Sequence, residues 1–269
     1  MDEDHQLYQG NFEGARQLRS HRTGVAIFDL DDTLVDREST FINAQLSLLE
    51  VLQSHGLDIE PKAELARLRV IDSRLIKYHG THNYDFAELA AALWMIYEGM
   101  SEDQAIRLCV KPLRGQLAAI AAEARARHND ALHKIPPLKE GAREVLQYLK
   151  DRYVLVLLSE GDEKIQMGVI EHYGLQSIFD AVLIRNSKTV KDFEIAKEVG
   201  LQILTREYDG TAEKIVVVGD RISQDIEPGN KISATTVWIP GPYLPGQPRL
   251  PYQRPTFTFP KLPDIVEVL

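Results

Sequence analysis

Two aspartates follow a short apolar segment near the start of the chain. Residues 25–28 are apolar, which is typical of a strand covered on both faces in a parallel sheet. Asp29 and Asp31 come directly after it, two residues apart. Clustered acids repel one another, so this arrangement is favourable only where a cation or a reaction needs them. An isolated Asp-x-Asp is more often a turn or a helix cap, but the preceding apolar run and the following Thr33 favour the functional interpretation.

Further polar residues follow apolar segments later in the chain. Residues 154–158 are apolar and end at Ser159, and a second such run ends before Asp220, with Asp225 five residues later. Ligands of open parallel sheets bind outside the carboxyl ends of the strands, so these side chains are predicted to converge with Asp29. Each has a structural alternative: Ser159 as a turn residue, Asp220 as a helix cap, and Asp225 as a first-turn acid facing the helix dipole.

In this order, the segments resemble the signatures of the haloacid dehalogenase (HAD) superfamily. Residues 25–34 are similar to the first signature and residues 154–159 to the second. Residues 215–220, followed by Asp225, resemble the fourth, GDxxxxD. The resemblance runs from about residue 24 to residue 240, and four ordered signatures are far more specific than one.

The third signature of this superfamily is a lysine, for which the chain offers two candidates. Lys188 precedes Thr189 and lies five residues before Phe193, a spacing similar to one variant of the family. Lys191 is close enough to compete, and either lysine is also compatible with a solvated charge at the start of a helix. We favour Lys188.

The resemblance implies phosphoester hydrolysis with Mg²⁺ as the cofactor. Asp29 would attack phosphorus and form an aspartyl-phosphate, while Asp31 would protonate the leaving oxygen and then activate water. The metal would be held by Asp29, Asp220 and the backbone carbonyl of Asp31. Asp225 would be a further ligand or an anchor behind the ligands.

The resemblance also implies a phosphate-binding group at the end of the second signature. It would consist of the Ser159 hydroxyl, the nearby backbone N–H groups of Glu160 and Gly161, and Lys188. Two positions depart from the family pattern. Glu160 stands where Asn or Gly is more common, and Thr189 replaces a frequent Pro. Neither removes a chemical role, but both weaken the transfer of a substrate from the family.

Asp31 indicates which chemistry within the superfamily to expect. The dehalogenases keep no Asp at this position because no leaving oxygen needs a proton, so Asp31 favours a phosphomonoesterase. A sugar phosphomutase would need the same acids and is the alternative among enzymes. A binding or regulatory protein without turnover is the other alternative, although all four acids are present.

The elements that must position these residues are of two kinds. Residues 136–269 alternate between helices and strands, which predicts right-handed crossovers and a doubly wound parallel, Rossmann-like sheet. Together with residues 22–36 they form the expected α/β catalytic core. Residues 37–135 show helical periodicity, with a break near Pro112, and are predicted to be an inserted all-helical cap. Residues 1–21 are expected to be a mobile extension.

The insert resembles the helical caps that close over the active site in small-molecule phosphatases of this family. A lid excludes water and bulky substrates, which favours a small phosphorylated metabolite over a phosphoprotein. The cap residues with a candidate role in substrate contact are Arg69, Arg74, Lys77, His79 and His82. Each of them is more often an ordinary surface residue.

The composition of the chain limits which classes of binding partner and which cellular compartment we expect. The chain has 31 basic and 40 acidic residues, a net charge of −9, which disfavours nucleic acid and anionic membranes as partners. No apolar run comes close to the length of about 20 residues that a membrane-spanning helix needs. The acidic amino terminus lacks signal-peptide features. The single Cys109 cannot form an internal disulfide, so we expect a core thiol and a cytoplasmic protein. The sequence leaves the substrate and the oligomeric state open.

Overall fold

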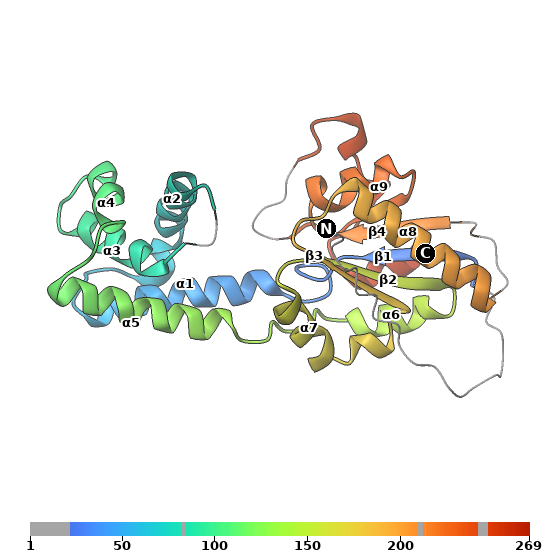
Figure 1. Ribbon diagram of the computed structural model, residues 1–269, viewed down its shortest axis with the longest axis horizontal. Helices are drawn as coiled ribbons and strands as arrows, with labels where there is room; N and C mark the ends of the chain where they lie inside the picture. The colour runs from blue at the N-terminus through green and yellow to red at the C-terminus, as the bar shows by residue number, and fades with distance from the viewer. Residues whose placement is uncertain (1–21, 82–83, 209–211, 213, 242–246) are drawn as a thin grey trace, which may run out of the picture. The chain divides into compact units, whose positions relative to one another are not determined.

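The computed structural model describes residues 22–81, 84–208, 212, 214–241 and 247–269. The chain divides into two compact units: residues up to Arg37 together with Ile135–Leu269, and Glu38–Lys134 (Figure 1). The predicted extension over residues 1–21 lies outside the described residues. In the described part of the chain, no helix is both long and apolar enough to cross a membrane.

The first unit is built on a parallel sheet. Its described strands pair in the order β3-β2-β1-β4-β5-β6, and every pair is parallel. They are β1 (Gly24–Phe28), β2 (Tyr153–Glu160), β3 (Ala181–Arg185), β4 (Lys214–Gly219), β5 (Thr235–Trp238) and β6 (Phe257–Thr258). The strand order reverses between β1 and β4, as in doubly wound Rossmann-like sheets. The predicted α/β fold class is confirmed.

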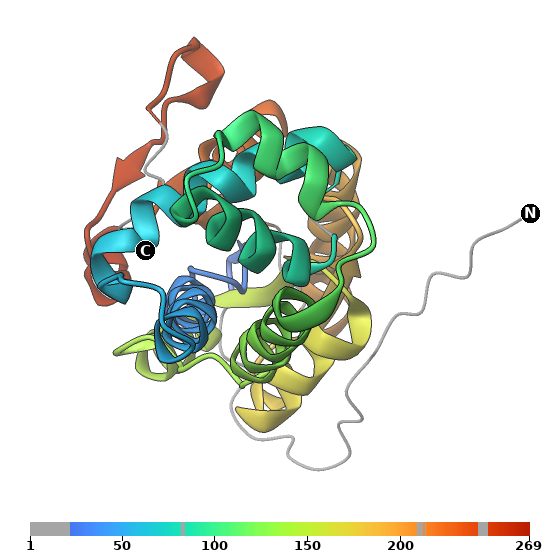
Figure 2. The same ribbon diagram turned by 90° about the vertical axis from the view of Figure 1, so that its left-hand side faces the viewer.

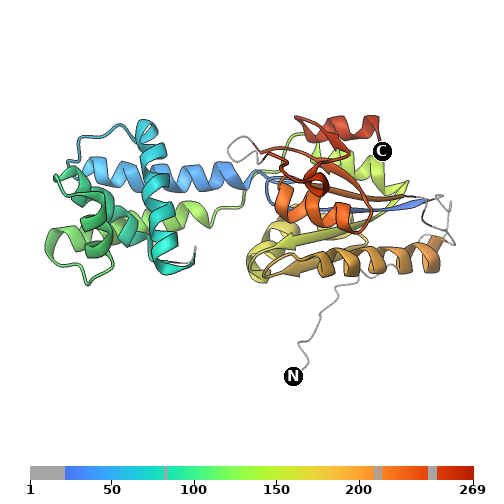
Figure 3. The ribbon, with the colours of Figure 1, turned by 90° about the horizontal axis from the view of Figure 1, so that it is seen from above.

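Helices cover both faces of this sheet. Buried side chains of β1 alternate, with Val25 and Ile27 in one core cluster and Ala26 and Phe28 in the other. The helix α8 (Val190–Tyr208) packs on the Val25 face, and α6 (Ala142–Lys150) and α7 (Glu163–His172) pack on the Phe28 face (Figures 1 and 3). A strand that is buried on both faces has apolar residues at every position. The strand β1 could therefore be predicted from its sequence.

The second unit contains helices and no strand in its described residues, as the periodicity predicts. Its helices are α1 (Arg37–Ser54), which begins at the boundary, α2 (Pro61–His79), α3 (Phe86–Tyr97), α4 (Glu102–Cys109) and α5 (Gly115–Leu132). The helix α3 packs against both α4 and α5 (Figure 2). The expected break near Pro112 separates α4 from α5. Cys109 is buried in the core of this unit.

The structure has two local features that the apolar pattern of the sequence does not reveal. The strand β2 continues through Ser159 and Glu160 because these residues pair with Ile184 and Arg185 of β3. After Asp220 the chain forms a π-helical turn, Ile222–Ile226, before the short helix α9 (Glu227–Lys231). Apolar periodicity could not reveal either feature, because one depends on a neighbouring strand and the other on backbone hydrogen bonding.

One glycine allows α8 to lie close to the sheet. A Cβ atom at Gly200 would overlap Cγ1 of Val25 and lie 3.3 Å from Cγ2 of Val156. Both valines belong to the central strands, so the helix could accommodate a larger residue here only by moving away from the core. Gly168 in α7 is different, since a Cβ there would meet no atom within 4 Å.

These two glycines give a matched test of the packing. Gly200→Ala is expected to lower the free energy of unfolding by about 1–3 kcal/mol through overpacking. Gly168→Ala is expected to raise it by about 0.5–1 kcal/mol, because alanine is the better helix former. Denaturant titration followed by circular dichroism measures both values. Equal stabilisation by the two substitutions would show that α8 does not approach the sheet as described.

Candidate active site

The carboxyl ends of three neighbouring strands bring the predicted residues together. Asp29 follows β1, and its backbone N–H donates to the carbonyl of Val218 in β4 over 3.0 Å. Asp220 follows the last residue of β4, while Ser159 and Glu160 end β2. The strand order reverses between β1 and β4, which is where doubly wound sheets bind their ligands.

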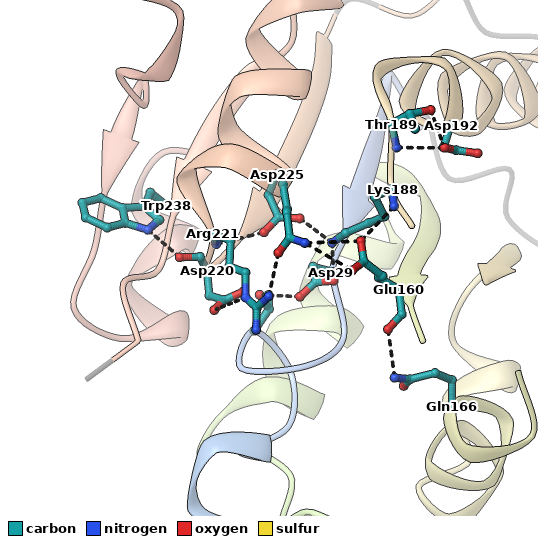
Figure 4. Close-up of polar contacts among 12 residues, drawn as sticks. Asp29, Glu160, Gln166, Lys188, Thr189, Asp192, Asp220, Arg221, Asp225 and Trp238 are labelled. Carbon is teal, nitrogen blue, oxygen red and sulfur yellow. Dashed lines mark hydrogen bonds and ion pairs between the residues drawn. The ribbon is translucent and has the colours of Figure 1, made fainter. Parts of the chain in front are cut away.

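Asp29, Asp220 and Asp225 form a compact acidic cluster (Figure 4). One carboxylate oxygen of each lies within 4.8 Å of the others, and their side chains are 8%, 11% and 1% exposed. Burial, opposed by Lys188 but reinforced by Asp225, raises the pKa of Asp29 to about 7. Burial and repulsion from Asp29 and Asp225 raise the pKa of Asp220 to about 9.

This set of donors fits a hard divalent cation. Carboxylate oxygens are the side-chain ligands that Mg²⁺ prefers. The raised pKa values of Asp29 and Asp220 indicate that a charged carboxylate is costly at these two positions without further positive charge. Within the described residues, these are the acidic side chains grouped at metal-ligand spacing.

Lys188 provides positive charge beside the acidic cluster. Its Nζ lies 2.6 Å from Oδ1 of Asp29 and 2.5 Å from Oδ1 of Asp225, and its side chain is only 4% exposed. Burial lowers the pKa of Lys188, but the charges of Asp225 and Asp29 outweigh burial and the net direction is upward. Lys191, the competing candidate, is exposed in the first turn of α8.

Asp225 is held in place by the backbone around it. A Cβ atom at Gly219 would overlap Cβ and Cγ of Asp225, so only glycine permits this approach to the end of β4. The backbone N–H of Arg221 donates to Oδ2 of Asp225 over 2.9 Å. Asp225 therefore has one oxygen fixed by the backbone and the other directed to Lys188.

The Asp31 carboxylate points to a different set of groups. Nε2 of Gln166 donates to its Oδ2 over 2.8 Å, and Nε of Arg37 lies 3.4 Å from its Oδ1. The side chain of Asp31 is therefore outside the acidic cluster. That its backbone carbonyl binds a metal stays a prediction.

The predicted phosphate-binding residues differ in whether their hydrogen-bonding groups already have a partner within the protein. Ser159 is fully buried, and its hydroxyl has no hydrogen-bond partner in the described part of the chain. Such an unsatisfied group at the end of a central strand is suited to a ligand oxygen. The Gly161 N–H already donates to the carbonyl of Arg185 over 2.9 Å, so binding phosphate would require giving up that bond. The Glu160 carboxylate accepts a hydrogen bond from the backbone N–H of Lys188.

Three of the five cap residues proposed to contact substrate form ion pairs within the helical unit. The pairs are Arg69 with Glu38, Arg74 with Glu102 and Asp103, and His79 with Glu88. Lys77 lines a surface pocket together with Arg74, Tyr78 and Ile106. His82 lies outside the described residues. Substrate contact by any of these residues stays a prediction.

Sequence reasoning assigned no role to four residues that support the site. Thr33 donates to Oδ2 of Asp29 over 3.3 Å, and the indole N–H of Trp238 donates to the Asp220 carbonyl over 2.7 Å. Arg37 and Gln166 contact Asp31, as described above. Thr33 and Gln166 belong to segments that resemble the family, which is a usable signal. Arg37 and Trp238 carry none, because only the fold brings them near the acids.

The chain is similar in sequence to proteins of one known family. The profile of the haloacid dehalogenase-like hydrolases matches residues 23–232. Glyceraldehyde 3-phosphate phosphatase of Pyrococcus furiosus is 25% identical over 254 residues, covering 92% of this chain and 93% of that protein. Human N-acylneuraminate-9-phosphatase is 25% identical over 225 residues, covering 81% and 83% of the two chains.

Solved structures share the fold. The HAD-hydrolase YfnB from Bacillus subtilis superposes with a TM-score of 0.57 at 19% sequence identity, covering 92% of this chain and 99% of that one. A haloacid dehalogenase-like hydrolase from Xanthomonas campestris gives 0.56 at 20% identity, covering 92% and 96%. Because the family profile spans most of the sequence and all four signatures, this chain belongs to the haloacid dehalogenase-like hydrolases.

Proposed function

We propose that this protein is a Mg²⁺-dependent phosphomonoesterase that acts on a small phosphorylated metabolite through a phospho-Asp29 intermediate. The observation that carries the proposal is the buried acidic cluster around Lys188, with Asp29 at the end of the central strand β1. Asp31, two residues on, is not part of this cluster and contacts Gln166 and Arg37 instead, and we assign it the proton transfer.

The proposed reaction has two steps. In the first, an oxygen of Asp29 forms a bond to phosphorus as the bond from phosphorus to the ester oxygen breaks. Asp31 gives its proton to that leaving oxygen. In the second, Asp31 takes a proton from water, whose oxygen attacks phosphorus. The bond to Asp29 then breaks, which releases inorganic phosphate and restores both acids.

The surrounding residues prepare the site for an anionic ester. Gln166 and Arg37 contact Asp31 and would orient it, while Lys188 and the Ser159 hydroxyl would bind phosphoryl oxygens. Asp29, Asp220 and Asp225 would hold Mg²⁺, whose charge reduces the repulsion between a carboxylate and a phosphate ester. The YfnB structure is described as bound to magnesium, which supports this choice of metal.

The relatives support a small substrate. Two of them are phosphatases, named for glyceraldehyde 3-phosphate and for N-acylneuraminate 9-phosphate. Both compounds are phosphorylated metabolites, and neither is a phosphoprotein or a nucleic acid. At about 25% identity we extend the substrate class to this chain, without naming the ester.

The first prediction tests the reaction. With Mg²⁺, the protein is expected to release phosphate from an aryl phosphate and to prefer one compound among sugar phosphates, nucleotides, phosphoglycolate and phosphoamino acids. Asp29→Asn is expected to lose turnover on every compound while still showing a cooperative thermal unfolding transition, because the amide has the same shape as the carboxylate but cannot act as the nucleophile. Isomerisation without net phosphate release would indicate a phosphomutase. Full activity in Asp29→Asn would refute the nucleophile.

The second prediction separates the two lysines. Lys188→Ala should lower kcat by about 100- to 1000-fold, as expected when one preorganised charge-stabilising group is removed. Lys191→Ala is the matched control and should stay close to the wild-type rate, because Lys191 is exposed. Steady-state kinetics with the aryl phosphate measures both. The reverse ranking would make Lys191 the active-site lysine.

The third prediction concerns the metal. Asp220→Asn is expected to raise the Tm of the chelator-treated protein by about 2–4 °C, since burial and the neighbouring acids make the Asp220 carboxylate costly. The same substitution should weaken the stabilisation that Mg²⁺ gives the wild type. Differential scanning calorimetry with EDTA or Mg²⁺ measures both effects. An undiminished Mg²⁺ response in Asp220→Asn would exclude Asp220 as a ligand.

A further inference from the structure

Glu160 joins the loop that carries Lys188 to the segment that carries Asp225. Its Oε2 accepts a hydrogen bond from the backbone N–H of Lys188 over 2.8 Å. Nε2 of Gln224 lies 3.2 Å from Oε1 and 3.4 Å from Oε2 of the same carboxylate. One side chain thus contacts two segments that follow different strands of the sheet.

These contacts close a ring around the active-site lysine. Lys188 Nζ binds Asp225, and the residue preceding Asp225 is Gln224, which binds Glu160. Glu160 in turn holds the backbone of Lys188. The lysine is therefore fixed at both ends, at its ammonium by the acids and at its backbone by Glu160.

The backbone of Lys188 needs such an anchor because it belongs to no helix or strand. It lies between the end of β3 at Arg185 and the start of α8 at Val190. Asn186 and Ser187, which precede it in the loop, are exposed. On the other side, the N–H and Oγ1 of Thr189 donate to Oδ2 of Asp192 over 2.8 and 2.6 Å.

Glu160 and Thr189, the two residues that depart from the family pattern, both lie next to the backbone N–H of Lys188: Glu160 accepts its hydrogen bond, and Thr189 is the following residue. A proline at position 189 would have no N–H to donate to Asp192, whereas Thr189 makes that bond and adds a hydroxyl. Glutamate at position 160 reaches the N–H of Lys188 with an oxygen that carries charge, and hydrogen bonds to charged acceptors are the stronger ones. In this chain, hydrogen bonds to the side chains of Glu160 and Asp192 hold the loop. In the family pattern, the ring of a proline at position 189 would restrict the backbone of the loop instead.

We infer that Glu160 is a positioning residue, whose carboxylate holds the Lys188 loop and the Gln224–Asp225 segment together so that the lysine ammonium stays between Asp29 and Asp225. The catalytic part of this inference rests on the function proposed above. The anchoring part is independent of it, since it concerns hydrogen bonds of the protein alone.

Hydrogen exchange tests the anchor directly. In Glu160→Ala, the backbone amide of Lys188 should exchange at least about 10-fold faster than in the wild type, because its acceptor is gone. Glu163→Ala is the matched control: it removes an exposed glutamate three residues away and should leave this amide unchanged. Mass spectrometry of peptides covering residues 186–190 measures both. Unchanged exchange in Glu160→Ala would overturn the inference.

Kinetics with an aryl phosphate and Mg²⁺ tests whether Glu160 acts through Lys188. Glu160→Ala should lower kcat by about 10- to 100-fold with KM changed by less than about 3-fold, as for a misplaced catalytic group. Glu160→Gln, which keeps an acceptor oxygen, should recover most of the rate, and Glu163→Ala should match the wild type. When Lys188 has already been replaced by alanine, adding Glu160→Ala should lower kcat by less than about a further 3-fold.

The outcomes separate the inference from the proposed function. An equal loss from Glu160→Ala with and without Lys188 would show that Glu160 does not act through the lysine and would overturn the inference. If the wild type hydrolyses no phosphate ester, the proposed function fails. The exchange rates of the Lys188 amide then still decide whether Glu160 is its anchor.

Discussion

The buried pairing of one lysine with two aspartates is the interaction on which this site depends. Asp29 and Asp225 are almost inaccessible to water, and each lies within 2.6 Å of the Lys188 ammonium. Removing like charges from water is costly unless an opposite charge is close and well oriented. The end of β1, the loop after β3 and the segment after β4 must therefore take up their positions together, since each supplies one member of the group.

The parallel sheet brings the end of β1, the loop after β3 and the segment after β4 close together. Because β1 lies between β2 and β4, residues that follow these strands emerge at the same edge. The backbone contact from Asp29 to Val218 fixes the two central ends relative to one another. Glycine at position 219 then lets Asp225 fold back onto the end of β4. The chemistry proposed here needs no unusual element apart from the π-helical turn after Asp220.

Much of the fold followed from local patterns. The buried run of β1, the later alternation of strands and helices, and the helical periodicity of the insert predicted the α/β class and its helical insertion, which the structure has. The extension of β2 through Ser159 and Glu160 was missed, because it depends on pairing with β3. The cytoplasmic location and the roles of the helical unit's polar residues stay predictions.

The sequence by itself determined the family and the candidate residues: its ordered signatures include Asp29, Asp31, Ser159, Asp220 and Asp225, each in a segment that follows or ends a predicted strand. Only the tertiary structure decided which lysine reaches the acids and which residues hold it. Lys188 and Asp29 are 159 positions apart, and Glu160 and Gln224 are 64 apart. Spacing along the chain cannot fix such contacts, because they depend on how the four parallel strands β1 to β4 align side by side. Lys188 lies in the loop after β3 and reaches the acids, whereas Lys191 is exposed in the first turn of α8.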